Sequence, residues 1–318
     1  MQLSSGPWDG GLACRPQPVL VAHPIWQGVP RLSLTRITDR LMFVLLWTSA
    51  VLVAVVIAAI ILFVGKEGVT TFRTASLASV LLSPRWAPPQ SFGILIFFLG
   101  SLAVTVLAMV IAVPVGLAGS IFLAKLAPEW MRVLMRPAIN LFVGIPSVVY
   151  GYVGMTVLVP LARQVSGSVG FGLGVAGIIL AVMVLPTITT VSEDAIRSVP
   201  TALVEGSLAL GATRWETISR VILPAARPGI LASIILAFAR AFGETTAVQM
   251  VVGNAPIFPR NLFEPTSTLT SEIIQEMGQT APGTTWYFSL FLMAFGLLLT
   301  SLVAILVVRY VARRGVAA

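Results

Sequence analysis

The stretch Glu205–Pro224, EGSLALGATRWETISRVILP, lies between two long apolar runs and is the most polar part of the second half of the chain. It predicts two short helices joined by a sharp turn. Gly211 suits the left-handed conformation that ends a helix, and the pattern T-R-W-E at 213–216 is a capping box that starts the next one. We expect Pro224 and Pro228 to end that second helix. A polar hairpin between membrane spans is a poor lipid anchor, so it is expected to meet another protein.

The spacing in this hairpin resembles the EAA loop of ABC-importer permeases, E-A-A-x3-G-x9-I-x-L-P. Gly206 and Ser207 stand where that family has two alanines, and Val221 stands where it has isoleucine. The resemblance implies that the hairpin docks into a groove on a cytoplasmic ATPase; the alternative is a cytoplasmic loop with no such partner. The residues expected to couple to the ATPase are Glu205, Gly206, Ser207, Gly211, Trp215 and Pro224.

Composition indicates an integral membrane protein, because 57% of the residues are hydrophobic and only 10% are charged. Six apolar runs are long enough to cross a bilayer. The net charge of +8 would also fit a nucleic-acid-binding protein. Most of the Lys and Arg residues, however, fall in segments that we place in the cytoplasm. This is the positive-inside bias of membrane proteins, so no nucleic-acid partner is expected.

Several kinds of chemistry are not expected. Cys14 is the one cysteine, so no disulfide within the chain is possible. His23 is the one histidine, which argues against a metal site built on imidazole. Neither Lys66 nor Lys125 lies in a G-x4-G-K-[ST] loop. The chain is therefore expected to be no enzyme, to need no cofactor, and to leave ATP hydrolysis to a separate subunit.

The order of the apolar runs predicts an all-α integral membrane protein. Its spans are expected at 41–64, 92–123, 139–161, 173–190, 229–252 and 286–308, with further short helices at 69–82 and 271–277 and a kink at Pro114. The predicted organisation is a weakly ordered cytoplasmic tail (1–36), a first transmembrane helix (37–64), an external loop (65–91), a core of five spans (92–312) with the coupling loop near 198–226, and a cytoplasmic tail (313–318).

The third span contains an interruption at Gly144–Gly151, GIPSVVYG. Pro, Ser and Tyr in the middle of a span predict a broken helix, which is tolerated where protein or a water-filled cavity satisfies the freed backbone groups. We therefore place Ser147 and Tyr150 beside a substrate path. The alternative is a kink that serves packing alone.

Arg240 and Glu244 are charged residues inside the fifth span, four positions apart and so on one face of a helix. Each costs about 2.5–3.5 kcal/mol at the bilayer centre, which places both toward a bundle interior or a water-filled path. One hypothesis is a buried ion pair that fixes packing. The other is that Arg240 binds a tetrahedral oxyanion through two parallel hydrogen bonds. Glu244 would then favour phosphate, which carries a proton at neutral pH, over sulfate, which does not.

The stretch Arg240–Val248, RAFGETTAV, followed by Gly253-Asn254, is similar to a signature of phosphate ABC-transporter permeases. The segments GIPSVVYG at 144–151 and Leu185-Pro186-Thr187 resemble further signatures of that family, and Trp86-Ala87-Pro88 resembles its PstC-type subunit. The sister PstA type usually has A-P after G-E-T, where this chain has Thr246-Ala247-Val248. The resemblance covers about residues 40–312.

The resemblance implies a six-helix permease of the type I, MetI-like importer architecture, in the inner membrane of a prokaryote with both termini in the cytoplasm. Its expected partners are a second permease of the PstA type, two copies of an ATP-binding subunit, an external phosphate-binding protein and membrane lipid. Two alternatives stay open: an importer for sulfate, molybdate or tungstate, and an ion-coupled secondary transporter that uses Glu244. The docking hairpin argues against the second.

Overall fold

The computed structural model describes residues 33–316, with side chains from 38 to 310. The chain divides into two compact units, residues 1–57 and 58–318. The helices are α1 (Ser33–Thr70), α2 (Leu77–Leu81), α3 (Leu95–Ile121), α4 (Glu129–Gly144), α5 (Ser147–Val153), α6 (Val159–Ser166), α7 (Leu173–Arg197), α8 (Thr201–Ala209), α9 (Arg214–Thr217), α10 (Leu223–Phe242), α11 (Thr246–Val251), α12 (Leu269–Met277) and α13 (Thr285–Val316).

Residues 33–57 of the first unit form the first part of α1, which continues into the second unit. Of the tail predicted at 1–36, residues 1–32 lie outside the described residues. Residues 33–36 are helical and belong to α1. The predicted helix at 69–82 was wrong in its bounds. α1 runs on to Thr70, a single 3₁₀ turn covers Thr71–Arg73, and α2 is a separate short helix.

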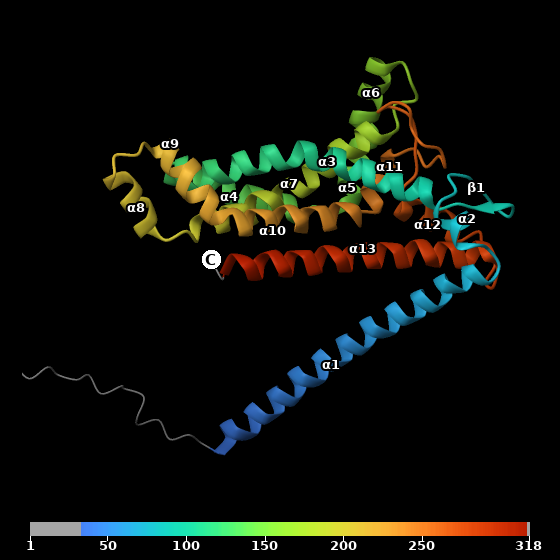
Figure 1. The fold of residues 1–318 in the computed structure, drawn as a ribbon, viewed down its shortest axis with the longest axis horizontal. Coiled ribbons are helices and arrows are strands. Elements are labelled where there is room, and N and C mark those ends of the chain that lie inside the picture. The colour runs from blue at the N-terminus through green and yellow to red at the C-terminus, as the bar shows by residue number, and fades with distance from the viewer. Residues whose placement is uncertain (1–32, 317–318) are drawn as a thin grey trace, which may run out of the picture. The chain divides into compact units, whose positions relative to one another are not determined.

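Six helical segments are long and apolar enough to cross a membrane, in agreement with the predicted number among the residues described. They are Thr38–Arg73, Leu95–Leu126, Ser147–Ser166, Leu173–Arg197, Arg214–Phe242 and Thr285–Tyr310. One feature outside the all-α expectation is a small antiparallel ribbon, in which β1 (Trp86–Ala87) pairs with β2 (Ser91–Phe92). The ribbon and α12 lie at the end of the second unit opposite α8 and α9 (Figure 1).

The core of the second unit is built around α7, which packs against α3 and α10; α10 packs in turn against α13. These long helices run side by side (Figure 1). Small residues allow the close approach: a Cβ on Gly116 of α3 would lie 2.7 Å from Cγ2 of Ile188 of α7, and one on Gly177 would lie 2.7 Å from Cδ2 of Leu107. α3 continues through Pro114 into a π-helical turn at Phe122–Leu126.

The third predicted span is corrected by the structure. Its first part, with the loop expected before it, forms α4, and the helix ends at Gly144. Ile145 and Pro146 are extended, with ψ of 126° and 140°, before α5 begins at Ser147. The ring of a proline disfavours helical conformation in the residue before it, so Pro146 forces the break one residue upstream. The membrane-length segment therefore runs through α5, a π-helical turn and α6.

The fifth predicted span was wrong at both ends. Pro224 and Pro228 do not stop the second hairpin helix: a π-helical turn at Ile218–Ile222 leads directly into α10, which holds both prolines. Pro224 sits in the first turn of α10, directly after the π-helical turn. At its other end α10 stops at Phe242 rather than reaching 252, and α11 begins at Thr246.

Candidate functional site

The charged residues of the fifth span flank the break between α10 and α11. Arg240 lies in the last turn of α10, and Glu244 lies in the irregular segment that follows. Glycine at 243 weakens a helix by about 1 kcal/mol relative to alanine, and the Glu244 carbonyl freed by the break accepts a hydrogen bond from the Thr270 hydroxyl at 3.1 Å. The break is thus stabilised by α12, an element distant in the sequence.

Arg240 makes its polar contact with α7 and not with Glu244. Its Nη1 donates to Oγ1 of Thr187 at 3.0 Å, and its side chain is exposed. The ion pairs of the described residues do not include Arg240 with Glu244, so the hypothesis of a buried ion pair between them was wrong. The physical reason is that α10 ends at Phe242, so Arg240 and Glu244 do not lie on one face of a continuous helix. Most of the guanidinium donors remain available.

Glu244 keeps free acceptor capacity. Its side chain is half-buried, and one carboxylate oxygen, Oε1, accepts a long 3.5 Å hydrogen bond from the backbone N–H of Ala247 in the first turn of α11. An ionised carboxylate offers about four acceptor positions. Glu244 can therefore meet a further hydrogen-bond donor without first losing a strong partner.

Ser147 and Tyr150 lie on the first turn of α5, just after the break at Ile145-Pro146. The Tyr150 hydroxyl donates to the carbonyl of Phe142 at 2.8 Å, which satisfies one of the carbonyls left unpaired at the end of α4. α5 packs closely on α11, because a Cβ on Gly151 would lie 3.0 Å from Cα of Ala247. Ser147 is half-buried.

Sequence reasoning missed Thr187 as a member of this group. The structure brings Thr187 of α7 and Arg240 of α10 together through their hydrogen bond. The available signal was the hydroxyl directly after Pro186 in the fourth span, within a segment noted for its resemblance but given no role. Among the described residues no group of three or more Cys, His, Asp or Glu side chains could hold a metal ion.

The hairpin of α8 and α9 forms at the end of the second unit (Figure 1). Gly211 has φ of +86°, as its predicted role requires, and its N–H donates to the Leu208 carbonyl at 3.0 Å. The predicted capping box is present: the Glu216 N–H donates to Oγ1 of Thr213 at 3.2 Å, and the Thr213 N–H donates to Oε2 of Glu216 at 3.0 Å. These contacts define the turn from local sequence alone.

The expected coupling residues lie on one exposed hairpin. Ser207 is hydrogen-bonded to Thr217 at 3.0 Å, joining α8 to the end of α9. Glu205 is exposed, and a Cβ on Gly206 would meet no atom within 4 Å. Trp215 is 63% exposed, and the neighbouring Leu210 is 91% exposed. Pro224 is exposed at the start of α10. The hairpin thus presents apolar side chains that this chain does not cover.

Comparison with known proteins places these features in a family. Residues 116–315 match the family described as "Binding-protein-dependent transport system inner membrane component". The chain is 45% identical over 262 residues to the "Probable ABC transporter permease protein YqgH" of Bacillus subtilis, covering 80% of this chain and 85% of that one. It is 33% identical over 302 residues to the "Phosphate transport system permease protein PstC" of Mesorhizobium japonicum, covering 87% and 91%. Its identity to the PstC of Haemophilus influenzae is 36% over 254 residues, 72% and 79% of the two chains.

Solved structures share the fold. A chain of a bacterial alginate ABC transporter, in complex with a periplasmic protein bound to an alginate pentasaccharide, superposes with a TM-score of 0.60 at 15% identity over 89% of this chain and 96% of that one. A chain of the inward-facing methionine transporter MetNI superposes with a TM-score of 0.51 at 23% identity, over 67% and 93%. The architecture is therefore that of MetI-like ABC transporter permeases.

Proposed function

Because the chain belongs to the family of binding-protein-dependent transport system inner membrane components, and is thus a multi-pass permease of an ABC importer, we propose that its cargo is inorganic phosphate. The observation that carries this proposal is Arg240, an arginine with uncommitted donors at a break between two helices of the bundle. The similarity to several PstC permeases supports the same cargo.

The chemistry of Arg240 suits a tetrahedral oxyanion. A guanidinium stays charged at every working pH and offers two parallel N–H donors that match two oxygens of phosphate. Thr187 accepts a hydrogen bond from one terminal nitrogen and so orients the fork. Ser147 and Tyr150 lie on the first turn of α5, directly after the break at Pro146. These side chains line the proposed path.

Glu244 supplies the proposed selectivity. Its carboxylate attracts the proton that phosphate still carries at neutral pH and repels fully ionised sulfate. This division requires a carboxylate with spare acceptor positions near the arginine. Glu244 has the spare acceptor positions, since its side chain makes only a 3.5 Å contact with a backbone N–H, and it follows Arg240 by four residues across the break.

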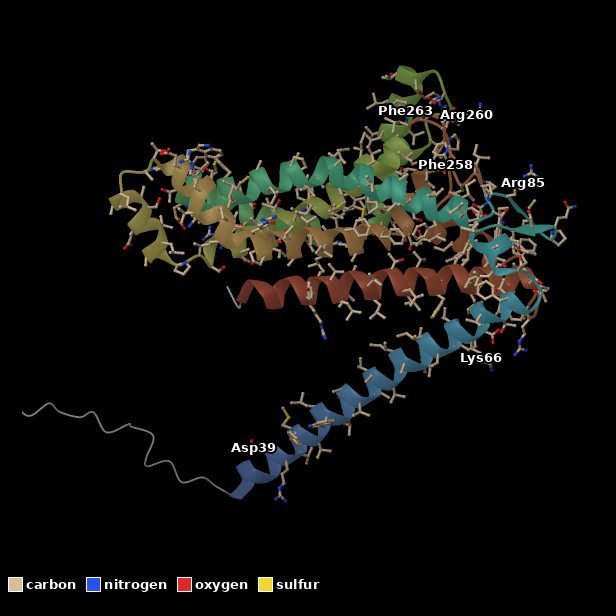
Figure 2. The ribbon with its side chains drawn as sticks, viewed as in Figure 1. Asp39, Lys66, Arg85, Phe258, Arg260 and Phe263 are labelled. Atoms are coloured by element: carbon tan, nitrogen blue, oxygen red, sulfur yellow. The ribbon has the colours of Figure 1, made fainter. Side chains whose placement is uncertain are left out.

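The hairpin of α8 and α9 is proposed to dock this permease on its ATPase. Exposed Trp215 and Leu210 provide the apolar contact, and the open space around Gly206 admits close approach of another backbone. The complete importer then holds a second permease of the PstA type, two ATP-binding subunits and an external phosphate-binding protein. The hairpin and both termini face the cytoplasm of a prokaryote. The opposite end of the unit, which carries Phe258 and Arg260 (Figure 2), faces the binding protein.

The first test is uptake of labelled phosphate in cells that lack their own high-affinity system, supplied with this chain and its partners. We expect Arg240→Gln to lower uptake at least 10-fold, because one charged bidentate contact is worth about 1.5–3 kcal/mol. Arg309→Gln is the matched control, since Arg309 is an exposed arginine of α13 that belongs neither to the coupling hairpin nor to the end proposed to face the binding protein. Assembly of each variant is checked by co-purification of the ATPase. Equal uptake by both variants would reduce Arg240 to a packing residue.

A second test addresses the cargo. Glu244→Gln is expected to admit sulfate as a competitor of phosphate uptake, because the amide neither attracts the phosphate proton nor repels sulfate. The ratio of the two inhibition constants is the readout, with Glu67→Gln as control. An unchanged ratio would contradict the assigned role of Glu244. Uptake of sulfate, molybdate or tungstate in place of phosphate by the unaltered chain would contradict the proposed cargo.

A further inference from the structure

A cluster of four basic side chains lies where α4 meets the end of α7 that leads into α8. Its anchor is Glu193, which is only 3% exposed. Nε and Nη2 of Arg136 donate to Oε1 of Glu193 at 3.0 and 2.9 Å, and Nη2 of Arg197 lies 2.8 Å from the same oxygen. Two guanidinium groups from two helices therefore share one carboxylate, which leaves one positive charge uncompensated.

The remaining two cations add to this excess. Arg132 is paired with Glu129 through a single 3.2 Å contact, and the Glu129 side chain is 79% exposed, so that pair is weak. Lys125 has no hydrogen-bond or ion-pair partner among the described residues, and it lies in the π-helical turn whose Leu123 carbonyl accepts a hydrogen bond from Nη2 of Arg197 at 3.3 Å. The basic cluster (Lys125, Arg132, Arg136 and Arg197) carries more positive charge than its neighbours offset.

One donor of the cluster is also left without a partner. Nε of Arg132 is buried and makes no hydrogen bond. A buried donor without a partner is costly, and more so when it is charged, so the presence of this one indicates a missing acceptor. Arg132 lines a cavity of about 280 Å³, well above the minimum that admits a small polar group. That cavity is lined by Glu129, Arg132, Val133, Arg136, Pro137 and Arg197.

The charges around the cavity favour an anion with several acceptor oxygens. Three guanidinium groups line it against one exposed carboxylate, that of Glu129. Asp194 lines a separate cavity of about 210 Å³ that it shares with Arg136 and Glu193. The forks of several guanidinium groups can pair with the oxygens of one phosphate group, whereas a single carboxylate offers them only two oxygens. A phosphate group would also satisfy the buried Nε of Arg132.

The helix that carries the cluster has the composition of a helix at a membrane surface. α4 exposes Trp130 (66%), Leu134 (65%) and Leu141 (73%) along with its arginines. Tryptophan and basic residues are enriched where lipid headgroups meet water, and an anionic membrane surface attracts basic residues that lie near it. Both an anionic lipid headgroup and free phosphate can therefore reach the cavity.

We propose that this cavity, between α4 and the end of α7, is a binding site for a phosphate group, held by Arg132, Arg136 and Arg197 with Lys125 nearby. The ligand is either the phosphodiester headgroup of an anionic lipid or inorganic phosphate. The placement on the cytoplasmic side rests on the proposed function, whereas the chemistry of the site does not. This site is distinct from Arg240, which lies at the other end of α10 from the coupling hairpin.

The test measures binding and not transport. The assembled complex is purified, stripped of lipid and titrated with phosphatidylglycerol or zwitterionic phosphatidylcholine, with bound lipid counted by native mass spectrometry. A second arm titrates inorganic phosphate by equilibrium dialysis in an Arg240→Gln background, so that the proposed translocation path contributes nothing. Arg132→Gln is the main variant, because it leaves the contacts of Arg136 and Arg197 with Glu193 in place. Arg132→Lys keeps the charge and removes the fork, and Arg85→Gln is the matched control.

We expect Arg132→Gln to weaken binding about 10-fold or more, Arg132→Lys to fall between it and the unaltered chain, and Arg85→Gln to change nothing. A loss confined to phosphatidylglycerol assigns the site to lipid headgroups, and a loss confined to inorganic phosphate assigns it to the free anion. Unchanged binding of both ligands by assembled Arg132→Gln complexes would overturn the proposal. Because uptake is not measured, that outcome is separable from a failure of the proposed function.

Discussion

Glu272 of α12 provides a quantitative test of how the second unit is held together outside the membrane spans. Its side chain is 2% exposed, and its Oε2 accepts a hydrogen bond from the Ser267 hydroxyl at 2.7 Å. Glu276, one turn later, accepts hydrogen bonds from the indole N–H groups of Trp86 at 3.0 Å and Trp286 at 2.6 Å. Burial first, and then the negative charge of Glu276, raise the pKa of Glu272 to about 8.

The direction of the pH effect follows from where the proton is held. The folded chain keeps a proton on Glu272 up to about pH 8, whereas the unfolded chain releases it near the ordinary pKa of 4.5. Stability is therefore highest at low pH and falls as pH rises through this window. At 1.36 kcal/mol per pKa unit, raising the pH from about 6 to about 9 costs about 2.5 kcal/mol. Glu272→Gln removes this dependence, because an amide does not titrate.

Thermal unfolding of the detergent-solubilised chain at the two pH values measures the effect. A change of about 2.5 kcal/mol corresponds to a shift in Tm of about 4 °C for a protein of this size. We expect that shift in the unaltered chain and in the control Glu67→Gln, and a much smaller one in Glu272→Gln. Equal melting at both pH values in the unaltered chain, or full pH dependence in Glu272→Gln, would refute the reasoning.

Three further changes test packing and coupling. Gly116→Ala places a Cβ 2.7 Å from Ile188 and is expected to lower the free energy of unfolding by about 1–3 kcal/mol. Gly119→Ala, whose Cβ would lie 3.6 Å from Thr189, should change it by no more than about 0.5 kcal/mol. The difference is measured as a shift in Tm, and equal shifts would contradict the close approach of α3 to α7. Glu193→Ala leaves two partly exposed guanidinium groups without their shared partner, so we expect a loss of about 1–3 kcal/mol and faster proteolysis of α4, with no change expected if the cluster contributes no packing. Proline at 211 cannot adopt φ of +86° and lacks the N–H donor of Gly211, so the Gly211→Pro variant should reach the membrane but lose both ATPase co-purification and uptake. Gly211→Asn should retain both, because asparagine tolerates the left-handed conformation. Normal uptake by the proline variant would contradict the docking role of the hairpin.

Local features of the chain were predictable where neighbouring residues decide them. The number of spans was predictable from bilayer thickness and hydropathy, since crossing about 30 Å of bilayer requires about 20 apolar residues however the helices pack. The turn at Gly211 and the capping box of Thr213 and Glu216 were predicted because both involve residues within one turn of each other. The break at Gly144–Gly151 followed from Pro146 in the same way.

Other features depend on residues that are distant in the sequence. Pro224 and Pro228 looked like stops, yet a π-helical turn lets α10 continue through them. Arg240 and Glu244 looked like a helical pair, yet α10 ends between them, and Thr270 satisfies the carbonyl that the break frees. Neither outcome is encoded in a window of ten residues.

The sequence by itself determined that this chain crosses a membrane, where its helices break for proline, and which hairpin stands out from the bundle, because hydropathy, proline sterics and capping act over short distances. Only the tertiary structure decided that Arg240 meets Thr187 and that Arg136 of α4 joins Glu193 of α7, whose pair with Arg197 is an i,i+4 contact within one helix. Those partners lie 53 and 57 positions apart in the first and second cases. Such contacts exist only after α7 has packed between its neighbours, so the choice of partner for a buried charge belongs to the packed bundle.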